Sequence, residues 1–247
     1  MSLVSAGVAV LLILSAEAIG VTIVVLTFIL FNRYWGGFDL DVTSTSHFNL
    51  HPFLMILGFV FLYGNALMVF KVGAGVNISK FKLKLVHFLL QLTAFTLSVF
   101  ALLAVFKYHR QHGYPNMISL HNWVGLTTVI FFGLQLVLGF LIFLFPRPNE
   151  RIRAAFKTFH VFFGIFIFGM VMVSVLTGVT EQVFYKGGFE GLNSQVIICN
   201  LLSLLLLAFA GLVTYIITNP FFSLADPNEG AEPREESALL QEIKQKD

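Results

Sequence analysis

Residues 50–70 read LHPFLMILGFVFLYGNALMVF, a run of 21 residues without a charged side chain. A helix needs about 20 apolar residues to cross the roughly 30 Å of hydrocarbon in a bilayer. The run therefore predicts one membrane span. It also carries a histidine, His51, within the first turn of that helix.

Five further runs share this character, and of the 247 residues 57% are hydrophobic and only 11% are charged. Such a balance lies far outside the range of soluble globular proteins. The other runs are Val8–Phe31, Leu85–Phe106, His121–Phe145, Thr158–Thr180 and Ser194–Thr218. We expect an all-α membrane protein with six transmembrane helices in one domain, residues 1–218, because the connections leave no room for a soluble domain.

Two isolated side chains inside these spans limit the kinds of site that the chain can form. Glu17 is the only acid within a span, and we expect it to be protonated and hydrogen bonded in a packing role. Cys199 is the single cysteine, so neither a disulfide framework nor a thiolate metal cluster is available. Any redox function therefore needs a bound cofactor.

Four histidines, His51, His87, His121 and His160, each lie near the start of one of four consecutive spans. Antiparallel helices place His51 and His121 at one face of the membrane and His87 and His160 at the other. Neutral imidazole is a common haem-iron ligand, so the layout predicts two haems, each held by two histidines, inside a four-helix bundle of spans two to five. Two alternatives are helix–helix hydrogen bonding and a haem-free, histidine-lined metal or proton transporter.

Glycines in these spans either clear space for a macrocycle or allow close helix packing, and we expect packing for most of them. They are Gly58, Gly64, Gly125, Gly133, Gly139, Gly164 and Gly169.

Basic residues are distributed unequally between the two sets of loops. Four lie on one side: Arg33, Lys107, Arg110 and Lys186. Eight lie on the other: Lys71, Lys80, Lys82, Lys84, Arg147, Arg151, Arg153 and Lys157. Because cytosolic loops are enriched in Lys and Arg, we expect both termini in the cytosol, with His87 and His160 near that face.

Four short motifs surround the histidines: FNLHPFLM at residues 48–55, KLVH at 84–87, SLHNWVG at 119–125 and FHV at 159–161. In order and spacing they resemble the four haem motifs of the cytochrome b561 family, and the resemblance covers roughly residues 8–218. It implies six helices and two b haems, with electrons passing from cytosolic ascorbate to a lumenal acceptor. Ferric iron is the acceptor we expect, and monodehydroascorbate is the alternative.

The same resemblance assigns ascorbate binding to Lys80, Lys84 and Arg153, which precede His87 and His160 by seven, three and seven residues. No glycine-rich loop opens a nucleotide-binding unit in this sequence. We therefore expect the electrons to come from a small diffusible donor or from a partner protein. The alternative is that these cations only follow the positive-inside rule.

On the opposite side, Phe106, His109 and Asn116 match positions near the family's second substrate site. We expect His109, in the loop before span four, to act on a ferric chelate. Two departures from the family pattern, Ile118 in place of a tyrosine and Gln182 in place of a lysine, affect the acceptor side. His47 and His112 are expected to be ordinary loop histidines.

The remaining residues, 219–247, form a polar tail. Within it, Asp226–Asp247 is acidic in its first half and poor in aromatic residues, so we expect the tail to be disordered and cytosolic. Within it, EESALL at 235–240 resembles an acidic dileucine sorting signal. This predicts a sorting adaptor as partner and a late endosomal or lysosomal membrane, and the alternative is a short amphipathic turn. A homodimer would fit the family, and we expect no nucleic-acid partner.

Overall fold

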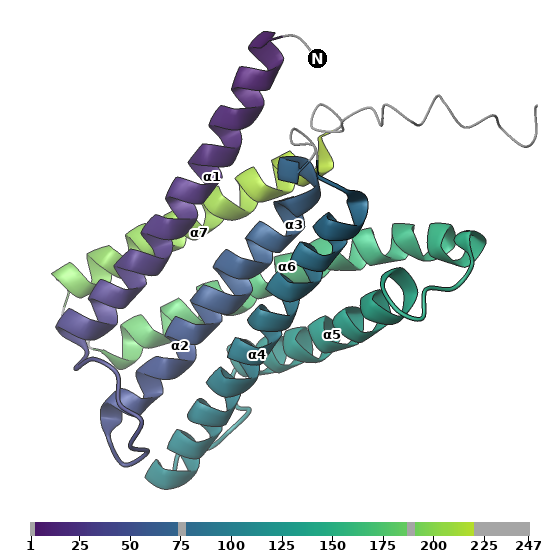
Figure 1. The fold of residues 1–247 in the computed structure, drawn as a ribbon. Coiled ribbons are helices and arrows are strands. Elements are labelled where there is room, and N and C mark those ends of the chain that lie inside the picture. Colours follow the sequence, from purple (N-terminus) through teal and green to yellow (C-terminus); the bar gives the residue numbers. More distant parts are fainter. Residues whose placement is uncertain (1–2, 74–77, 187–190, 220–247) are drawn as a thin grey trace, which may run out of the picture.

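The computed structural model describes residues 3–73, 78–186 and 191–219 (Figure 1). Six of its helices are long and apolar enough to cross a membrane, and the described residues contain no strand. The expected all-α fold with six spans is therefore confirmed. The predicted tail and its dileucine motif lie outside the described residues, apart from Asn219.

The first two spans contain irregular turns. Span one is α1 (Leu3–Ile29), extended by a π-helical turn, η1 (Leu30–Tyr34). Span two begins with a 3-10 turn, η2 (Thr45–Asn49), and continues through α2 (Leu50–Met55), the π-helical segment η3 (Ile56–Leu62) and α3 (Tyr63–Val72). The other four spans are α4 (Lys80–His112), α5 (Leu120–Phe143), α6 (Glu150–Tyr185) and α7 (Ser194–Thr218).

Helices α4 and α6 are longer than the apolar runs that predicted them. The Ser79 hydroxyl accepts a hydrogen bond from the Lys82 amide and caps the start of α4, while Gly113, with φ of 70°, ends it. Apolar patterning detects only the part inside hydrocarbon, whereas caps and polar turns extend the helix beyond it. His109 and His112 consequently lie on α4, and their expected placement in a loop is wrong.

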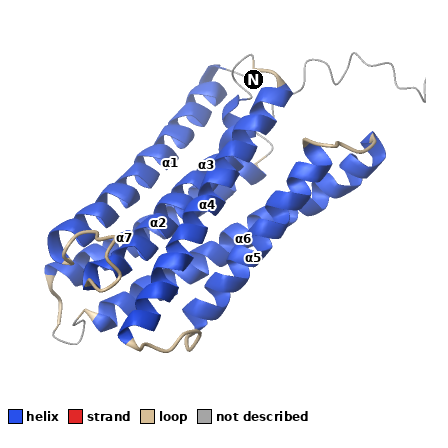
Figure 2. Ribbon diagram, turned by 60° about the horizontal axis from the view of Figure 1, so that its bottom comes forward, coloured by secondary structure: helices blue, strands red, loops and turns tan. Residues whose placement is uncertain are grey.

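The second span lies at the centre of the arrangement. It packs against α4 on one side and against α1 and α7 on the other, while α5 lies beside α6 (Figures 1 and 2). Further contacts join α4 to α5 and α3 to α6, so the four histidine-bearing spans form one bundle that α1 and α7 flank. Between α3 and α6, the hydroxyl of Tyr63, 1% exposed, donates to the carbonyl of Gly164 over 2.7 Å.

Gly58 shows why a small residue is needed where span two meets α4. A Cβ atom built on Gly58 would lie 3.0 Å from the Ala94 carbonyl oxygen, a backbone atom that cannot rotate away. At this glycine, then, the structure agrees with a packing role. Glu17 of α1 hydrogen bonds to the Asn65 side chain of α3, which agrees with its expected structural role.

An even number of spans returns the chain to the face where it started. The start of α1 and the end of α7 lie at the same end of the bundle (Figure 1). The start of α4, with His87, belongs to that end, and the start of α2, with His51, belongs to the other. We call them the His87 end and the His51 end.

Candidate functional site

The four histidines form two pairs. The rings of His51 and His121 have centroids 6.1 Å apart with planes at 85°, and those of His87 and His160 have centroids 6.2 Å apart with planes at 66°. Each pair joins one residue from the span-two/α4 side to one from the α5/α6 side. This is the pairing that antiparallel spans predicted.

The spacing fits a metal between the two rings of each pair. An imidazole nitrogen lies about 2.0–2.1 Å from a bound metal, and the ring centroid about 1.1 Å beyond it, so two opposed rings would have centroids about 6.2–6.4 Å apart. Both observed distances are close to this value. The donor set of each pair therefore suits a metal with two axial imidazoles.

Two ligands do not complete a site for a bare metal ion. Zinc and most other transition metals take at least three protein ligands, yet the described residues contain no group of three or more His, Cys, Asp or Glu that could hold a metal. A haem supplies the missing equatorial ligands from its macrocycle and leaves two axial positions for the protein. The paired histidines thus fit a haem better than a free metal.

Hydrogen bonds from Nδ1 to backbone carbonyls orient three of the four rings. In each case Nδ1 lies near a backbone carbonyl on the neighbouring helix, and because a carbonyl only accepts, Nδ1 carries the proton and Nε2 is left to coordinate. The carbonyl partners are Ala101 for His51 (3.3 Å), Ala66 for His87 (2.7 Å) and Ser174 for His121 (2.8 Å).

His160 is held differently. Its ring nitrogens form no hydrogen bond within the described ranges, and the Gln135 side-chain amide instead donates to its backbone carbonyl over 2.6 Å. This contact fixes the helix backbone at His160 but not the tautomer of its ring.

The two histidine pairs lie at different depths in the bundle. Helix α4 carries both His87 and Ala101, the partner of His51, while α6 carries both His160 and Ser174, the partner of His121. On each helix the two positions are 14 residues apart, which at a rise of about 1.5 Å per residue is about 21 Å along the helix axis. Helices α4 and α6 thus give the same separation, about two thirds of the roughly 30 Å thickness of the hydrocarbon core.

Two glycines lie directly against the histidine rings. A Cβ atom on Gly178 would be 2.7 Å from Cε1 of His121, and one on Gly139 would be 3.0 Å from Cε1 of His160. Gly139 belongs to the set that sequence analysis selected, whereas Gly178 does not. Nothing in the local sequence of Gly178 indicates its role, because the ring that it contacts is 57 residues away on another helix.

An aromatic cluster occupies the depth between the two pairs. Phe132 is its centre, with ring centroids 4.7 Å from Phe59, 4.8 Å from Tyr63 and 6.1 Å from Phe95. Phe132 is 3% exposed and Phe59 is 4% exposed. The sequence does not indicate this cluster, since aromatic residues are frequent throughout the spans.

At the His87 end, basic side chains gather around Lys84, which is half-buried. Lys84 interacts electrostatically with four other cations, Lys80, Arg147, Arg153 and Lys157. The structure therefore brings together the three residues expected to bind ascorbate. Within the described ranges no acidic side chain forms an ion pair with Lys84 or Arg153, so this mouth of the bundle attracts anions.

At the His51 end, His109 and Asn116 meet. Nδ1 of His109 lies 3.0 Å from Oδ1 of Asn116, and His109 is within electrostatic range of His51. Phe106, one turn earlier on α4, is half-buried and has no ring contact with His109 in the described part of the chain. A phenol is nevertheless close to His109, since the Tyr114 ring lies 6.0 Å away, whereas Ile118 is 68% exposed.

The two histidines expected in loops differ from that expectation. His112 lies at the end of α4 beside Tyr108, with ring centroids 4.2 Å apart. His47 lies in η2 and is only 7% exposed, with its Nδ1 3.1 Å from the Asp39 carbonyl oxygen. Hydropathy could not indicate this burial, because the loop that covers His47 folds back from residues 35–44.

Comparison with known proteins supports this picture. The family described as eukaryotic cytochrome b561 matches residues 50–186. The plasma membrane ascorbate-dependent reductase CYBRD1 of Xenopus tropicalis is 40% identical over 180 residues, which are 72% of this chain and 64% of the relative. The lysosomal membrane ascorbate-dependent ferrireductase CYB561A3 of Mus musculus is 36% identical over 209 residues, 81% of this chain and 86% of the relative.

A third relative is the transmembrane ascorbate-dependent reductase CYB561 of Ovis aries, 37% identical over 205 residues, 82% of this chain and 80% of the relative. The chain spans just under two thirds, 64%, of the length of the frog CYBRD1 proteins that it matches. The matched region includes all four paired histidines.

Proposed function

Because the chain belongs to the cytochrome b561 family, we propose that it carries electrons across a membrane from ascorbate to ferric iron. The observation that carries the proposal is the two imidazole pairs, with ring centroids 6.1 and 6.2 Å apart, at two depths of one helical bundle. Cytochrome b561 proteins bind haem b. When bound, the two haem irons supply one-electron oxidation and reduction.

The chain's own residues hold the cofactors in place. His87 and His160 hold one haem, and His51 and His121 hold the other. The carbonyl partners of the Nδ1 groups fix the rings of His51, His87 and His121 with Nε2 available. The aromatic cluster around Phe132 packs at the depth between the two pairs.

The donor site in this proposal is the cationic mouth at the His87 end. Ascorbate is an anion near neutral pH, and Lys84 and Arg153 offer charge-assisted hydrogen bonds one and two turns from the paired histidines. Lys80 adds charge at the edge of the same group. The basic loops support a cytosolic position for this mouth and for both termini.

The acceptor site lies at the His51 end, with His109 as its central residue. Asn116 Oδ1 only accepts, so Nδ1 of His109 donates and Nε2 remains free to coordinate ferric iron. The mouse relative named as a ferrireductase supports iron as the acceptor. The same relative, together with the dileucine motif of the tail, supports a lysosomal or late endosomal membrane and a sorting adaptor as partner, although the frog relatives are named plasma membrane proteins.

A visible spectrum of the purified protein tests the assignment. We expect two low-spin b haems per chain, both reduced by ascorbate, and loss of one haem in His87→Ala and in His51→Ala. The two single variants should lose different haems, which potentiometric titration distinguishes. A purified, folded protein without haem bands would instead support the haem-free metal or proton transporter.

A further inference from the structure

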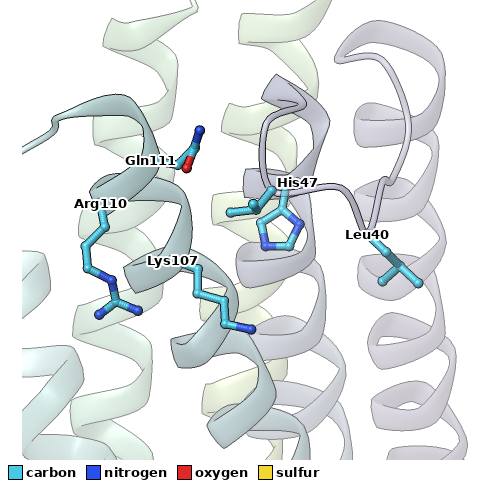
Figure 3. Close-up of a pocket in the computed structure, with 6 residues that line it drawn as sticks. Leu40, His47, Lys107, Arg110 and Gln111 are labelled. Atoms are coloured by element: carbon cyan, nitrogen blue, oxygen red, sulfur yellow. The ribbon is translucent and has the colours of Figure 1, made fainter.

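A cavity of about 400 Å³ opens at the His51 end, on the side of α4 that faces the loop between α1 and span two (Figure 3). Its volume is within the usual range for small-molecule sites. It is lined by Leu40, Val42, His47, Lys107, Arg110 and Gln111. Neither His109 nor Asn116 belongs to the lining, so the cavity is separate from the acceptor site described above.

His47 is the buried polar residue of this cavity. It is 7% exposed, and its Nδ1 donates to the Asp39 carbonyl over 3.1 Å. Its Nε2 is buried without a hydrogen-bond partner among the described residues. A buried polar atom without a partner is destabilising, so a hydrogen-bonding group supplied by a ligand would remove that penalty. Because Nδ1 already carries the proton, Nε2 accepts, and the ligand must offer a hydroxyl or another donor.

The opposite wall of the cavity is cationic. Lys107 extends from α4 toward His47, which lies between Lys107 and Leu40 in the view of Figure 3. Arg110, one turn away on α4, also lines the cavity, and its guanidinium is directed away from His47 in that view. Neither cation forms an ion pair within the described part of the chain. Gln111 adds an amide, and a guanidinium binds carboxylate with two parallel hydrogen bonds.

Two acids on the covering loop do not neutralise these cations. Asp39 accepts a hydrogen bond from the Asp41 amide over 2.9 Å, and Asp41 accepts from the amide and hydroxyl of Thr43 over 3.0 and 2.9 Å. These bonds keep the pKa of the Asp41 carboxyl below its usual value, so it stays charged, but neither acid lines the cavity.

The covering loop is fixed to the bundle. The buried Asn49 amide donates to the carbonyls of Trp35 and Gly37 over 2.8 and 2.7 Å, and the Ser46 hydroxyl donates to Gly36 over 3.0 Å. The wall that carries Leu40 and Val42 is thereby tied to the same turn that carries His47. The cavity is a preformed feature of the fold, which reduces the entropic cost of binding.

We propose that this cavity binds a small hydroxycarboxylate anion. Its carboxylates pair with Lys107 and Arg110, its hydroxyl donates to Nε2 of His47, and its methylene groups contact Leu40 and Val42. Inorganic phosphate offers neither the carbon skeleton nor the size for a cavity of about 400 Å³. The combination of cations, one acceptor nitrogen and an apolar wall selects an organic acid.

The position of the cavity gives this binding a role. His47 precedes His51 by four residues, about one helical turn. An anion bound in the cavity therefore lies near the pair formed by His51 and His121. The anion that donates its hydroxyl to His47 is the iron-free acid, because a ferric chelate uses that oxygen for the metal. The cations of the cavity also raise the local concentration of anionic ferric chelates beside it. This role rests on the proposed function, whereas the binding itself does not.

Isothermal titration calorimetry of the oxidised holoprotein in detergent tests the binding without electron transfer. Citrate is the probe, and tricarballylate, which is citrate without its hydroxyl, is the matched ligand. We expect citrate to bind the wild type, tricarballylate to bind several-fold more weakly, and that difference to vanish in His47→Ala. Lys107→Gln and Arg110→Gln should each weaken citrate affinity about five- to tenfold. This effect is smaller than for a buried ion pair, because both cations are exposed to solvent.

Lys186→Gln is the matched control, since Lys186 is an exposed cation at the same end that does not line the cavity. Citrate affinity should be unchanged in this variant, and two haems per chain in every variant would show that the fold is intact. Equal citrate affinity in wild type and Lys107→Gln, or preference for phosphate or ascorbate over citrate, would overturn the proposal. If citrate binds as expected but ferric citrate does not oxidise the reduced protein, the proposed function fails while this site remains.

Discussion

Replacing Gly178 with alanine should displace His121 and remove one haem. The added Cβ would lie 2.7 Å from Cε1 and 2.9 Å from Nδ1 of His121, against an ordinary contact of 3.4 Å or more. The ring must therefore retreat by about 0.7 Å, while metal–ligand distances tolerate about 0.2 Å. Its hydrogen bond to Ser174, 2.8 Å long, opposes the movement. Disturbing a hydrogen bond that orients a metal-binding histidine costs about 10–100-fold in metal affinity.

Haem content per chain, measured after purification by the pyridine haemochrome method, is the assay for this variant. We expect about two haems in the wild type and about one in Gly178→Ala. Gly169→Ala is the matched control, because it lies on the same helix with nothing within 4 Å of the added atom. Helix propensity alone would make both variants slightly more stable.

A potentiometric titration shows which haem is lost, and the survivor should be the one that His87→Ala removes. Gly139→Ala, whose Cβ lies 3.0 Å from His160, should disturb the other haem to a smaller extent. Two haems with unchanged electron paramagnetic resonance signals in Gly178→Ala would refute the contact between Gly178 and the His121 ring.

Three further predictions concern the donor, the acceptor and the tail. Lys84→Glu or Arg153→Glu should raise the ascorbate concentration that half-reduces the haems about tenfold or more, since charge-assisted contacts contribute about 1.5–3 kcal/mol. An unchanged titration would mean that both residues only follow the positive-inside rule and do not bind ascorbate. His109→Ala should slow stopped-flow oxidation of pre-reduced haem by ferric citrate while ascorbate reduction stays normal, and equal rates would favour monodehydroascorbate as acceptor. Leu239→Ala with Leu240→Ala should move the protein from late endosomal membranes to the cell surface in cell imaging, and an unchanged distribution would make the motif a chance match.

The pairing of the histidines could be predicted from sequence because it depends on few variables. Once the apolar runs define the spans, alternating direction decides which histidines share an end, and His51 must meet His121 there. The ends of the helices could not be predicted in this way. His109 and His112 belong to α4 because the polar turns after Phe106 continue the helix as far as Gly113.

Apart from the histidine pairs, the contacts between helices could not be predicted. Ser174 and Ala101 contribute only a backbone carbonyl to the rings of His121 and His51, a group that every residue carries. Gly178 needs its missing Cβ only because of the rotation of α6 against α5, which no local pattern encodes. His47 was misjudged for a similar reason, since its burial depends on a loop that folds back over it.

Transfer across a sealed membrane tests the central claim most directly. The holoprotein is reconstituted into liposomes with ascorbate trapped inside, and ferric citrate with a ferrous-specific dye is added outside. We expect ferrous iron to form outside at a rate that depends on the trapped ascorbate and falls to the protein-free rate in His87→Ala and in His121→Ala. Ferrous iron formation at the wild-type rate in either variant would contradict electron transfer by way of the two histidine pairs.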